Sequence, residues 1–402
     1  MPTQGNALHQ EGDRVRRVGT VPTMDDIRRE VGSYMILGPG NAEIVDLMLA
    51  VALSQEVDRP LWLMVVAPPS SGKTEMLKLI STVTGYHHIP ALSTRYLFSG
   101  HSDAQGGFMI REVRRKGLLA FPDFTTVLSM NPTARREVFN QLRVIHDGEA
   151  GRGTGIDTGG TRIWRGKVAV VACVTDTIER FREQSNDLGE RFLYYVFHPR
   201  NPEYGELAGM LTSPSARKSV QAKVKQLVHR RKSAVASVQI SGASGARLLA
   251  MAGFVGRARA PVVRERSTHE ISHVHPAEMP YRVNGGLSTL YRCLFVIRDG
   301  DIDGSMRIIT SVALSSVPAS RVDVFRAISS GGRTVKSIAE TVGLPETTVR
   351  RTVEDMEAQQ LLESCPIDGS NARVFVVHPG FRAQCIAVGL LSESGGGQAS
   401  SG

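Results

Sequence analysis

The sequence predicts an α/β protein in which a parallel sheet carries a phosphate-binding loop, followed by a helical region and a C-terminal helix-turn-helix domain. The first observation is the run Leu61–Ile80, LWLMVVAPPSSGKTEMLKLI, which combines an apolar strand, a tight loop and a helical pattern. The second is a set of apolar runs typical of buried parallel strands, at residues 117–121, 167–173 and 193–197. The third is the segment after Val317, where helical patterns alternate with turn and cap residues.

Composition narrows the class of protein. A length of 402 residues predicts two or three domains, and the 41% of hydrophobic residues can build a core. The net charge of +9 favours an anionic partner, with nucleic acid as the first candidate, or a basic solvated surface. The four cysteines lack the spacing of metal ligands or of a disulfide framework. Without a membrane-spanning apolar run or the apolar segment of a signal peptide, we expect a cytoplasmic protein with no membrane partner.

Two helices are expected ahead of the loop. Residues 1–20 are polar, and we expect them to be disordered. Met24–Gly32 matches a short helix, and Asn41–Val57 reads as an amphipathic helix that leads directly into the strand at Leu61. This second helix is therefore expected to pack over the loop.

The loop APPSSGKT, residues 67–74, has the strand before it and the helix after it that a phosphate-binding loop requires. Its backbone N–H groups and the positive end of the following helix would cradle phosphate oxygens. The pattern predicts ATP binding with Mg²⁺, because Lys73 would reach the β and γ phosphates and the Thr74 hydroxyl would bind the metal. Ala67 stands where the first glycine of the motif is usual. The expected contacts are Ala67, Pro68, Pro69, Ser70, Ser71, Gly72, Lys73, Thr74 and Glu75.

The run 117–126, GLLAFPDFTT, leads from four apolar residues through a proline to a single acid, Asp123. A carboxylate at the end of a second strand beside the loop holds the water shell of Mg²⁺ or activates the attacking water. If Phe121 ends the strand, Asp123 takes the position of the catalytic base and the metal-side acid is missing. If the strand ends one residue later, Asp123 is the metal acid and no glutamate follows it.

The next segments predict a helix, a hairpin and a strand. Thr133–His146 is expected to be helical, and the glycine-rich stretch 151–166 to form a hairpin with its turn at residues 158–160. The strand 167–173 leads to Thr175, and the carboxyl end of a central parallel strand is where open α/β sheets place their ligand chemistry. Thr175 is thus a candidate to sense the γ-phosphate or the attacking water. The alternative is a cap on the helix that follows it.

Taken in order, these segments resemble AAA+ ATPases, and within them an MCM-like group of phages and integrative mobile elements. The resemblance spans about residues 40 to 315 and rests on APPSSGKT, PDFTT, LRVIHDGEAGRGTG, VAVVACVT, LGERF and MPYRVNGGLSTLYRCLFVIRD. It implies that Thr175 is sensor 1, that Arg191 is the arginine finger and that Arg282 is the sensor 2 residue. It also implies a pore-facing hairpin that contacts nucleic acid through Arg152, Arg162 and Arg165.

The region between residues 206 and 314 is expected to be mostly helical. Its segment 216–235 is rich in Lys and Arg, and forms either a solvated helix face or a surface that tracks phosphates. His269–His273 fits the H-E-x-x-H pattern of zinc sites. Pro261 and Pro276 bracket a short polar segment there, however, which favours solvated or interface histidines over a zinc site.

After Val317 the pattern predicts two helices joined by a sharp turn. Thr334 caps the first helix, Gly343 makes the turn, and Pro345 opens a second helix that runs to Gln360. With the strand that follows, the segment resembles a winged-helix DNA-binding domain, although winged helices also serve protein contacts. The second helix would face a major groove and neighbouring arginines would contact phosphates. The candidates are Thr347, Arg350, Arg351, Arg333 and Arg373.

The combined resemblance implies a function. An arginine finger stabilises charge on a transferring phosphoryl group, and a head-to-tail contact would place it at the site of the next subunit. We therefore expect a hexameric ring that hydrolyses ATP and acts on DNA as a helicase or helicase loader in mobile-element replication. The alternative is an ATP-binding, slowly hydrolysing DNA-binding regulatory switch, which the missing second acid favours. The expected units are a disordered N-terminus (1–20), an AAA+ domain (21–204), a helical lid (205–316), a winged helix (317–385) and a flexible tail (386–402).

Overall fold

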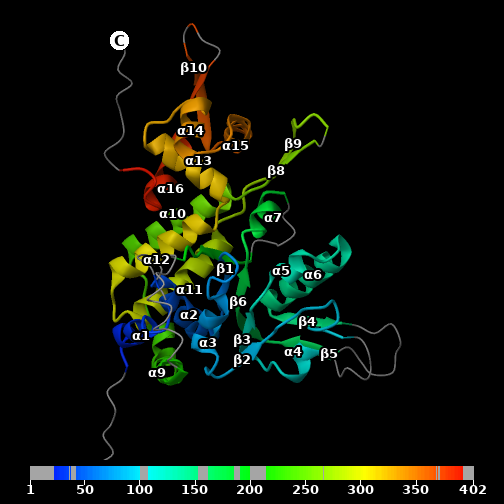
Figure 1. Cartoon of the computed structure of the whole chain (residues 1–402), viewed down its shortest axis with the longest axis vertical. Helices are drawn as coiled ribbons and strands as arrows, with labels where there is room; N and C mark the ends of the chain where they lie inside the picture. Colours follow the sequence, from blue (N-terminus) through cyan, green and yellow to red (C-terminus); the bar gives the residue numbers. More distant parts are fainter. Residues whose placement is uncertain are drawn as a thin grey trace, which may run out of the picture.

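The computed structural model of the chain describes most of the sequence (Figure 1). The described residues are 22–35, 37, 42–99, 107–152, 162–184, 191–199, 214–265, 267–367, 369 and 372–392. The expected disordered N-terminus, the turn at residues 158–160 and the tail from residue 393 lie outside these ranges.

The centre of the fold is a parallel sheet of five strands in the order β2-β3-β6-β1-β7. The phosphate-binding loop follows β1, so the predicted α/β fold is confirmed and agrees with a P-loop ATPase fold. β1, β3 and β6 lie side by side at the centre and are almost entirely buried. The strands are β1 (Trp62–Val66), β2 (Tyr86–His88), β3 (Lys116–Phe121), β6 (Lys167–Val174) and β7 (Leu193–Val196).

Helices cover both faces of the sheet, and alternate strand residues enter two separate cores. Leu63 and Val65 of β1 join the core beneath α2 (Glu43–Leu53) and α3 (Lys73–Ile80), whereas Met64 joins the core on the opposite face. That second core includes residues of α4 (Phe108–Arg111), α5 (Thr125–Leu128), α6 (Pro132–Asp147) and α7 (Ile178–Gln184).

The predicted helices ahead of the loop are confirmed, with small changes at their ends. α1 (Met24–Val31) begins with a capping box between Thr23 and Asp26. α2 ends at Leu53 and continues as a short 3₁₀ turn, η1 (Ser54–Glu56). α2 packs against α3, the helix that follows the loop, and the two share one core.

The described part of the lid region, from residue 214 onward, contains four α-helices and one hairpin. These are α9 (Pro214–Arg231), followed by the 3₁₀ turn η3 (Lys232–Ser237), α10 (Gly242–Ala258), the hairpin β8 (Val262–Arg264) and β9 (Ile271–Val274), α11 (Tyr281–Ile297) and α12 (Ile302–Ser315). The end of α12 covers the outer strand β7, since the hydroxyls of Ser315 and Ser316 accept hydrogen bonds from the amides of Val196 and Tyr194. A sheet edge that would otherwise expose its amides is thereby capped.

The basic segment 216–235 uses much of its charge inside the fold. Arg217 pairs with Glu75 at 2.8 Å, Lys223 with Glu30 at 2.5 Å and Arg231 with Asp299 at 2.6 Å. Each partner belongs to another element, so these cations fix the helix on the body of the protein. Neither a solvated helix face nor a phosphate-tracking surface accounts for these three internal ion pairs.

The C-terminal part consists of three helices, an antiparallel hairpin and a last short helix. The two predicted helices and the strand are confirmed as α14 (Val335–Val342), α15 (Glu346–Ala358) and β11 (Arg373–Val377). The other elements are α13 (Ala319–Ser329), β10 (Leu362–Pro366), η4 (Pro379–Phe381) and α16 (Arg382–Ala387). This part is joined firmly to α10. Buried Arg321 donates to the carbonyls of Ala258 and Ala260, both at 2.8 Å, and Arg257 donates to the carbonyl of Gln360 at 2.9 Å.

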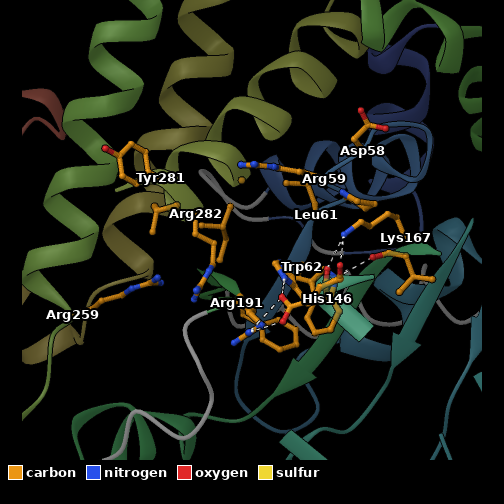
Figure 2. Close-up of a pocket in the computed structure, with 17 residues that line it drawn as sticks. Asp58, Arg59, Leu61, Trp62, His146, Lys167, Arg191, Arg259, Tyr281 and Arg282 are labelled. Atoms are coloured by element: carbon orange, nitrogen blue, oxygen red, sulfur yellow. Dashed lines mark hydrogen bonds and ion pairs between the residues drawn. The ribbon is translucent and has the colours of Figure 1, made fainter. Parts of the chain in front are cut away.

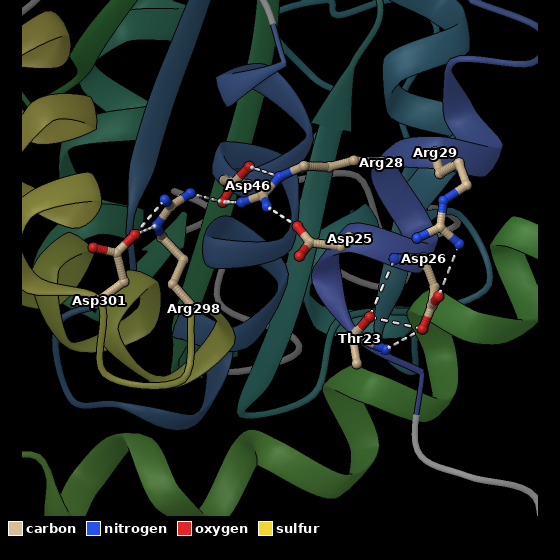
Figure 3. A network of polar contacts seen from close by, with 8 residues as sticks. All are labelled: Thr23, Asp25, Asp26, Arg28, Arg29, Asp46, Arg298 and Asp301. Atoms are coloured by element: carbon tan, nitrogen blue, oxygen red, sulfur yellow. Dashed lines mark hydrogen bonds and ion pairs between the residues drawn. The ribbon is translucent and has the colours of Figure 1, made fainter.

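A buried carboxylate connects the N-terminal helices to the lid (Figure 3). Asp46 of α2 is only 1% exposed and lies between two guanidinium groups. Arg28 of α1 donates through Nε at 3.0 Å, and Arg298 at the end of α11 donates at 2.8 Å. Arg298 also pairs at 2.5 Å with Asp301, which caps α12. The two N-terminal helices and the distant end of α11 therefore meet at one acid.

Replacing Asp46 with asparagine is expected to lower the free energy of unfolding by roughly 3 kcal/mol, because two cations would then lose their shared buried partner. Urea denaturation measures this change. Asp25→Asn is the matched control, since Asp25 also pairs with Arg28 but its side chain is 79% exposed. It should cost less than about 1 kcal/mol. Equal losses in the two variants would contradict a special role for the buried acid.

Candidate functional site

The phosphate-binding loop has the backbone shape that anion binding requires. Ser70 has a φ of 59° and Gly72 a φ of 83°, both in the left-handed region, and Gly72 directly precedes the first turn of α3. This turn leaves the first amides of α3 without partners inside the helix. Pro68, Pro69, Ser70 and Thr74 are exposed, so the loop is open to a ligand. The residues present therefore fit a polyphosphate.

The Lys73 ammonium lies within the loop. It donates to the carbonyl of Ala67 at 2.8 Å and to that of Pro68 at 2.6 Å. Partial burial lowers the pKa of Lys73 below its ordinary value, and the acidic groups Cys173, Asp123 and Asp176 oppose that shift. A cation held among loop carbonyls and near two carboxylates is well placed to exchange these contacts for phosphate oxygens.

Ala67 fits the first position of the loop because no left-handed conformation is needed there. The described residues with positive φ include Ser70 and Gly72 but not Ala67. Its amide donates to the carbonyl of Val174 at 3.0 Å and extends the pairing of β1 with β6, and its side chain is buried. The departure from glycine therefore leaves the shape of the loop intact.

Asp123 and Thr175 lie at the same edge of the sheet as the loop. β3 ends at Phe121, which is the first of the two alignments considered for Asp123. The Asp123 carboxylate is exposed and accepts a hydrogen bond from the amide of Thr125 at 3.0 Å. The Thr175 hydroxyl lies 3.5 Å from that of Thr125 and 3.0 Å from that of Thr177. The structure thus brings together the carboxyl ends of β1, β3 and β6.

Two residues at this edge were not predicted from the sequence. Thr125 bridges the ends of β3 and β6 through its hydroxyl, which also accepts from the amide of Thr175 at 3.3 Å. Asp176 is a second exposed carboxylate close enough to raise the pKa of Lys73. The signal available in the sequence was the polar run directly after each apolar strand, TT after PDF and TDT after the strand ending in Val174.

A second group of predicted residues gathers in a cleft of about 410 Å³ (Figure 2). Arg191, just ahead of β7, and Arg282, in the first turn of α11, both line it. Figure 2 shows these two side chains and Arg259 converging from three different elements. The other ionisable lining residues are Asp58, Arg59, His146, Asp147, Lys167 and Tyr281.

The cations of this cleft influence one another and are opposed by few acids. Burial lowers the pKa of Arg191, and the nearby Arg282 lowers it further, whereas Asp147 raises it. Arg191 lies 3.3 Å from the Asp147 carboxylate, and Arg282 lies 3.5 Å from that of Glu278. Burial lowers the pKa of His146 to about 4, so its ring is neutral at neutral pH. The cleft is suited to an anion.

The cleft and the phosphate-binding loop lie at opposite edges of one sheet. Trp62 and Lys167, the first residues of β1 and β6, line the cleft, whereas the loop follows the last residue of β1. The 5 residues of β1 alone separate the two edges by about 16 Å. Arg191 and Arg282 therefore lie far from the Lys73 of their own chain.

The candidate nucleic-acid contacts fall in two places. β4 (Glu149–Arg152) and β5 (Arg162–Arg165) form the base of the predicted hairpin, where Arg165 pairs with Glu149 at 2.9 Å. The side chains of Arg152 and Arg162 lie outside the described part of the structure. The second place is the C-terminal part, where Thr347, Arg350 and Arg351 of α15 and also Arg333 are exposed and Arg373 pairs with Glu357 at 3.2 Å.

The H-E-x-x-H segment does not form the helix that this zinc pattern needs. His269 lies in a turn with a φ of 61°, and Ile271–Val274 is strand β9. Glu270 and His273 consequently cannot share a helix face with His269. Within the described ranges, no group of three or more His, Cys, Asp or Glu residues could hold a metal ion.

Comparisons with known proteins add little beyond the fold. No protein-family model matches the chain, and no curated protein matches it. The chain is similar to a crystal structure described as a "putative ATPase" from Cytophaga hutchinsonii, at 10% identity and a TM-score of 0.42, over 73% of this chain and 85% of that one. It is also similar to the apo C-terminal region of NrS-1, at 10% identity and a TM-score of 0.32, over 90% of this chain and 77% of that one. At these scores the likeness carries no argument about function.

The helices were also compared with the length and hydropathy of a membrane span. Taken singly, none of those in the described ranges is both long and apolar enough to cross a bilayer. Two pairs of consecutive helices meet the length and hydropathy criteria only when each pair is taken together, and these pairs are bent by 98° and 114°.

Proposed function

We propose that the protein is an AAA+ ATPase that works as a head-to-tail ring on DNA. The observation that carries this proposal is the position of Arg191 and Arg282 at the edge of the sheet opposite the phosphate-binding loop. Within one chain, Arg191 and Arg282 lie at the edge opposite the loop and its Lys73, too far to reach a γ-phosphate that this loop would hold. A second copy, placed with its loop against this cleft, supplies what each site lacks.

In this proposal each group of the loop side has one task. The amides around Gly72 and the Lys73 ammonium hold the β and γ phosphates of ATP. Thr74 would hold Mg²⁺, which neutralises charge on the phosphates when it is bound. Asp123 and Thr175 would orient the attacking water, since both lie at the sheet edge beside the loop.

The groups of the cleft have the complementary task. A guanidinium that reaches the γ-phosphate stabilises charge that develops during phosphoryl transfer. Arg191 and Arg282 are the candidates, because their side chains face one another across a partly buried cleft. Partial burial strengthens their interaction with an anion.

The DNA part of the proposal rests on two surfaces. The β4–β5 hairpin begins directly after α6, whose last residue, Asp147, lines the cleft. Movement at the cleft can therefore reach the hairpin through one helix end. The C-terminal helices and hairpin have the order of a winged helix, with α15 presenting Arg350 and Arg351 to solvent.

Steady-state ATP hydrolysis, measured with Mg²⁺ in the absence and presence of single-stranded and duplex DNA, tests the proposal. We expect turnover that rises with protein concentration, because the site is shared between subunits, and that is stimulated by DNA. Turnover that is independent of both would contradict the motor.

A regulatory switch is the second candidate, and one observation favours it. Asp123 accepts a hydrogen bond from the amide of Thr125, and Pro122 occupies the metal-side position where an acid is usual when the strand ends at Phe121. A site with one acid could bind ATP and hydrolyse it slowly. Turnover near background together with tight, sequence-specific duplex binding would support this switch over the motor.

Replacing both Arg350 and Arg351 with alanine is expected to weaken duplex DNA binding by about tenfold. The slope of log K against log[salt] should also fall by the amount expected for the loss of roughly two phosphate contacts. Fluorescence anisotropy over a salt series measures both quantities. Arg326→Ala on α13 is the control, because this arginine is also exposed, at 60%, and pairs with Asp323. Equal effects of the two changes would argue against α15 as a DNA-binding surface.

A further inference from the structure

The arginines of the cleft differ in how firmly their carboxylate partners hold them. Arg259 is only 4% exposed and lies 2.5 Å from Glu278. Arg191 lies 3.3 Å from Asp147, and Arg282 lies 3.5 Å from Glu278. Strong charge-assisted hydrogen bonds measure about 2.7–2.9 Å. The carboxylate pair of Arg259 is thus shorter than those of Arg191 and Arg282, the two candidates for phosphate contact.

We infer that Asp147 and Glu278 are positioning residues, which hold Arg191 and Arg282 in the cleft until the phosphates of a neighbouring subunit's nucleotide displace them. This inference rests on the proposed ring. It adds that each arginine exchanges a partner in its own chain for a partner in the next chain. The carboxylates occupy the place that phosphate oxygens take in the assembled ring.

The exchange leaves every charged group with a partner or in contact with solvent. Carboxylate and phosphate oxygens both match the fork of a guanidinium, and a triphosphate carries more charge than a carboxylate. When Arg191 leaves, Asp147 is not stranded, because its side chain is 62% exposed and His146 lies 3.3 Å away. When Arg282 leaves, Glu278 keeps its pair with Arg259. Neither departure leaves a buried charge without a partner.

The exchange also has a consequence inside the chain. Asp147 is the last residue of α6, and the Lys167 ammonium donates to its carbonyl at 2.8 Å. Gly148 follows in the left-handed conformation, and the hairpin base begins at Glu149. Arg191 therefore holds the residue from which the hairpin departs. Its release to a neighbour's phosphate would remove one contact from that junction.

The test measures assembly of the full chain with Mg²⁺ and the slowly hydrolysed analogue ATPγS, by sedimentation velocity over a range of protein concentrations. Asp147→Asn should lower the concentration at half-assembly by about threefold, because the Asp147 carboxylate no longer competes with phosphate for Arg191. The KM for ATP should fall with it, while kcat changes little. Asp147→Ser is the second variant, since an asparagine amide can still accept from Arg191.

Asp58→Asn is the matched control. Asp58 lines the same cleft and is exposed, and no ion pair with Arg191 or Arg282 is found for it in the structure. The same Asp147 changes are also made in an Arg191→Ala background, where the inference expects them to have no effect on assembly.

Two outcomes separate this inference from the proposal beneath it. A wild-type protein that never assembles with nucleotide overturns the ring itself. Only the positioning role is overturned if the wild-type protein assembles but Asp147→Asn assembles no more tightly than Asp58→Asn. The same holds if Asp147→Asn assembles less tightly than wild type. Tighter assembly that persists in the Arg191→Ala background also overturns it, because the effect would then not pass through Arg191.

Discussion

Replacing Lys73 with alanine is expected to reduce ATP turnover by roughly 10²–10³-fold and to weaken nucleotide binding. The ammonium lies inside the loop on the carbonyls of Ala67 and Pro68, and no other described lysine bonds to the loop. Its loss removes the charge that faces the β and γ phosphates. Isothermal titration calorimetry with ATP and Mg²⁺ measures binding, and a coupled assay measures turnover.

Lys225→Ala is the control for this change. Lys225 is exposed on α9, away from the loop, so its removal alters the net charge equally without touching the site. It should bind and hydrolyse ATP as wild type does. If Lys73→Ala retained full binding and turnover, the loop would not be the nucleotide site, and both the motor and the switch would be wrong.

The loop side of the site could be predicted from sequence because its geometry is local. A strand, eight residues of loop and a helix suffice to specify it, and the structure bends at Ser70 and Gly72 as the motif requires. The ends of β3 and β6 were also predictable, since each apolar run stops at a polar residue that a parallel sheet brings to the same edge.

The cleft could not be predicted in the same way. Arg191, Arg259 and Arg282 come from three elements, and only the packing of the lid against the sheet brings them together. No pattern marks Asp147 and Glu278 as partners of these arginines, although Asp147 lies within the segment LRVIHDGEAGRGTG. The resemblance to AAA+ ATPases pointed to two of the arginines, but it said nothing about which acids hold them.

The charged residues of the lid show that composition alone cannot predict where their partners lie. The basic segment 216–235 left two readings open, because a row of cations looks the same whether its partners are internal or external. Its partners Glu30, Glu75 and Asp299 come from distant parts of the chain. Asp46 is similar, since nothing in the sequence marks it as an acid shared by two arginines.

Replacing Arg191 with alanine is expected to lower ATP turnover by about 10³-fold or more, while ATP binding to the isolated chain is retained. The reason is geometric. Arg191 lies at the amino-terminal edge of the sheet and the loop at the carboxyl-terminal edge, so in the proposed ring Arg191 would act on the nucleotide of another copy. Lys167→Ala is the control, because Lys167 lines the same cleft but its ammonium bonds to backbone carbonyls. This change should lower turnover much less than Arg191→Ala does.

Mixing the two inactive variants tests whether the site is shared. In an equal mixture of Lys73→Ala and Arg191→Ala chains, about a quarter of the interfaces pair an intact loop with an intact arginine, because each neighbour is drawn at random. Turnover should therefore reappear on mixing, although each variant alone is inactive. An arginine that served its own chain could not restore activity in this way, because every chain would still carry one defect. A mixture that stays inactive while its subunits assemble would thus place Arg191 outside the shared site.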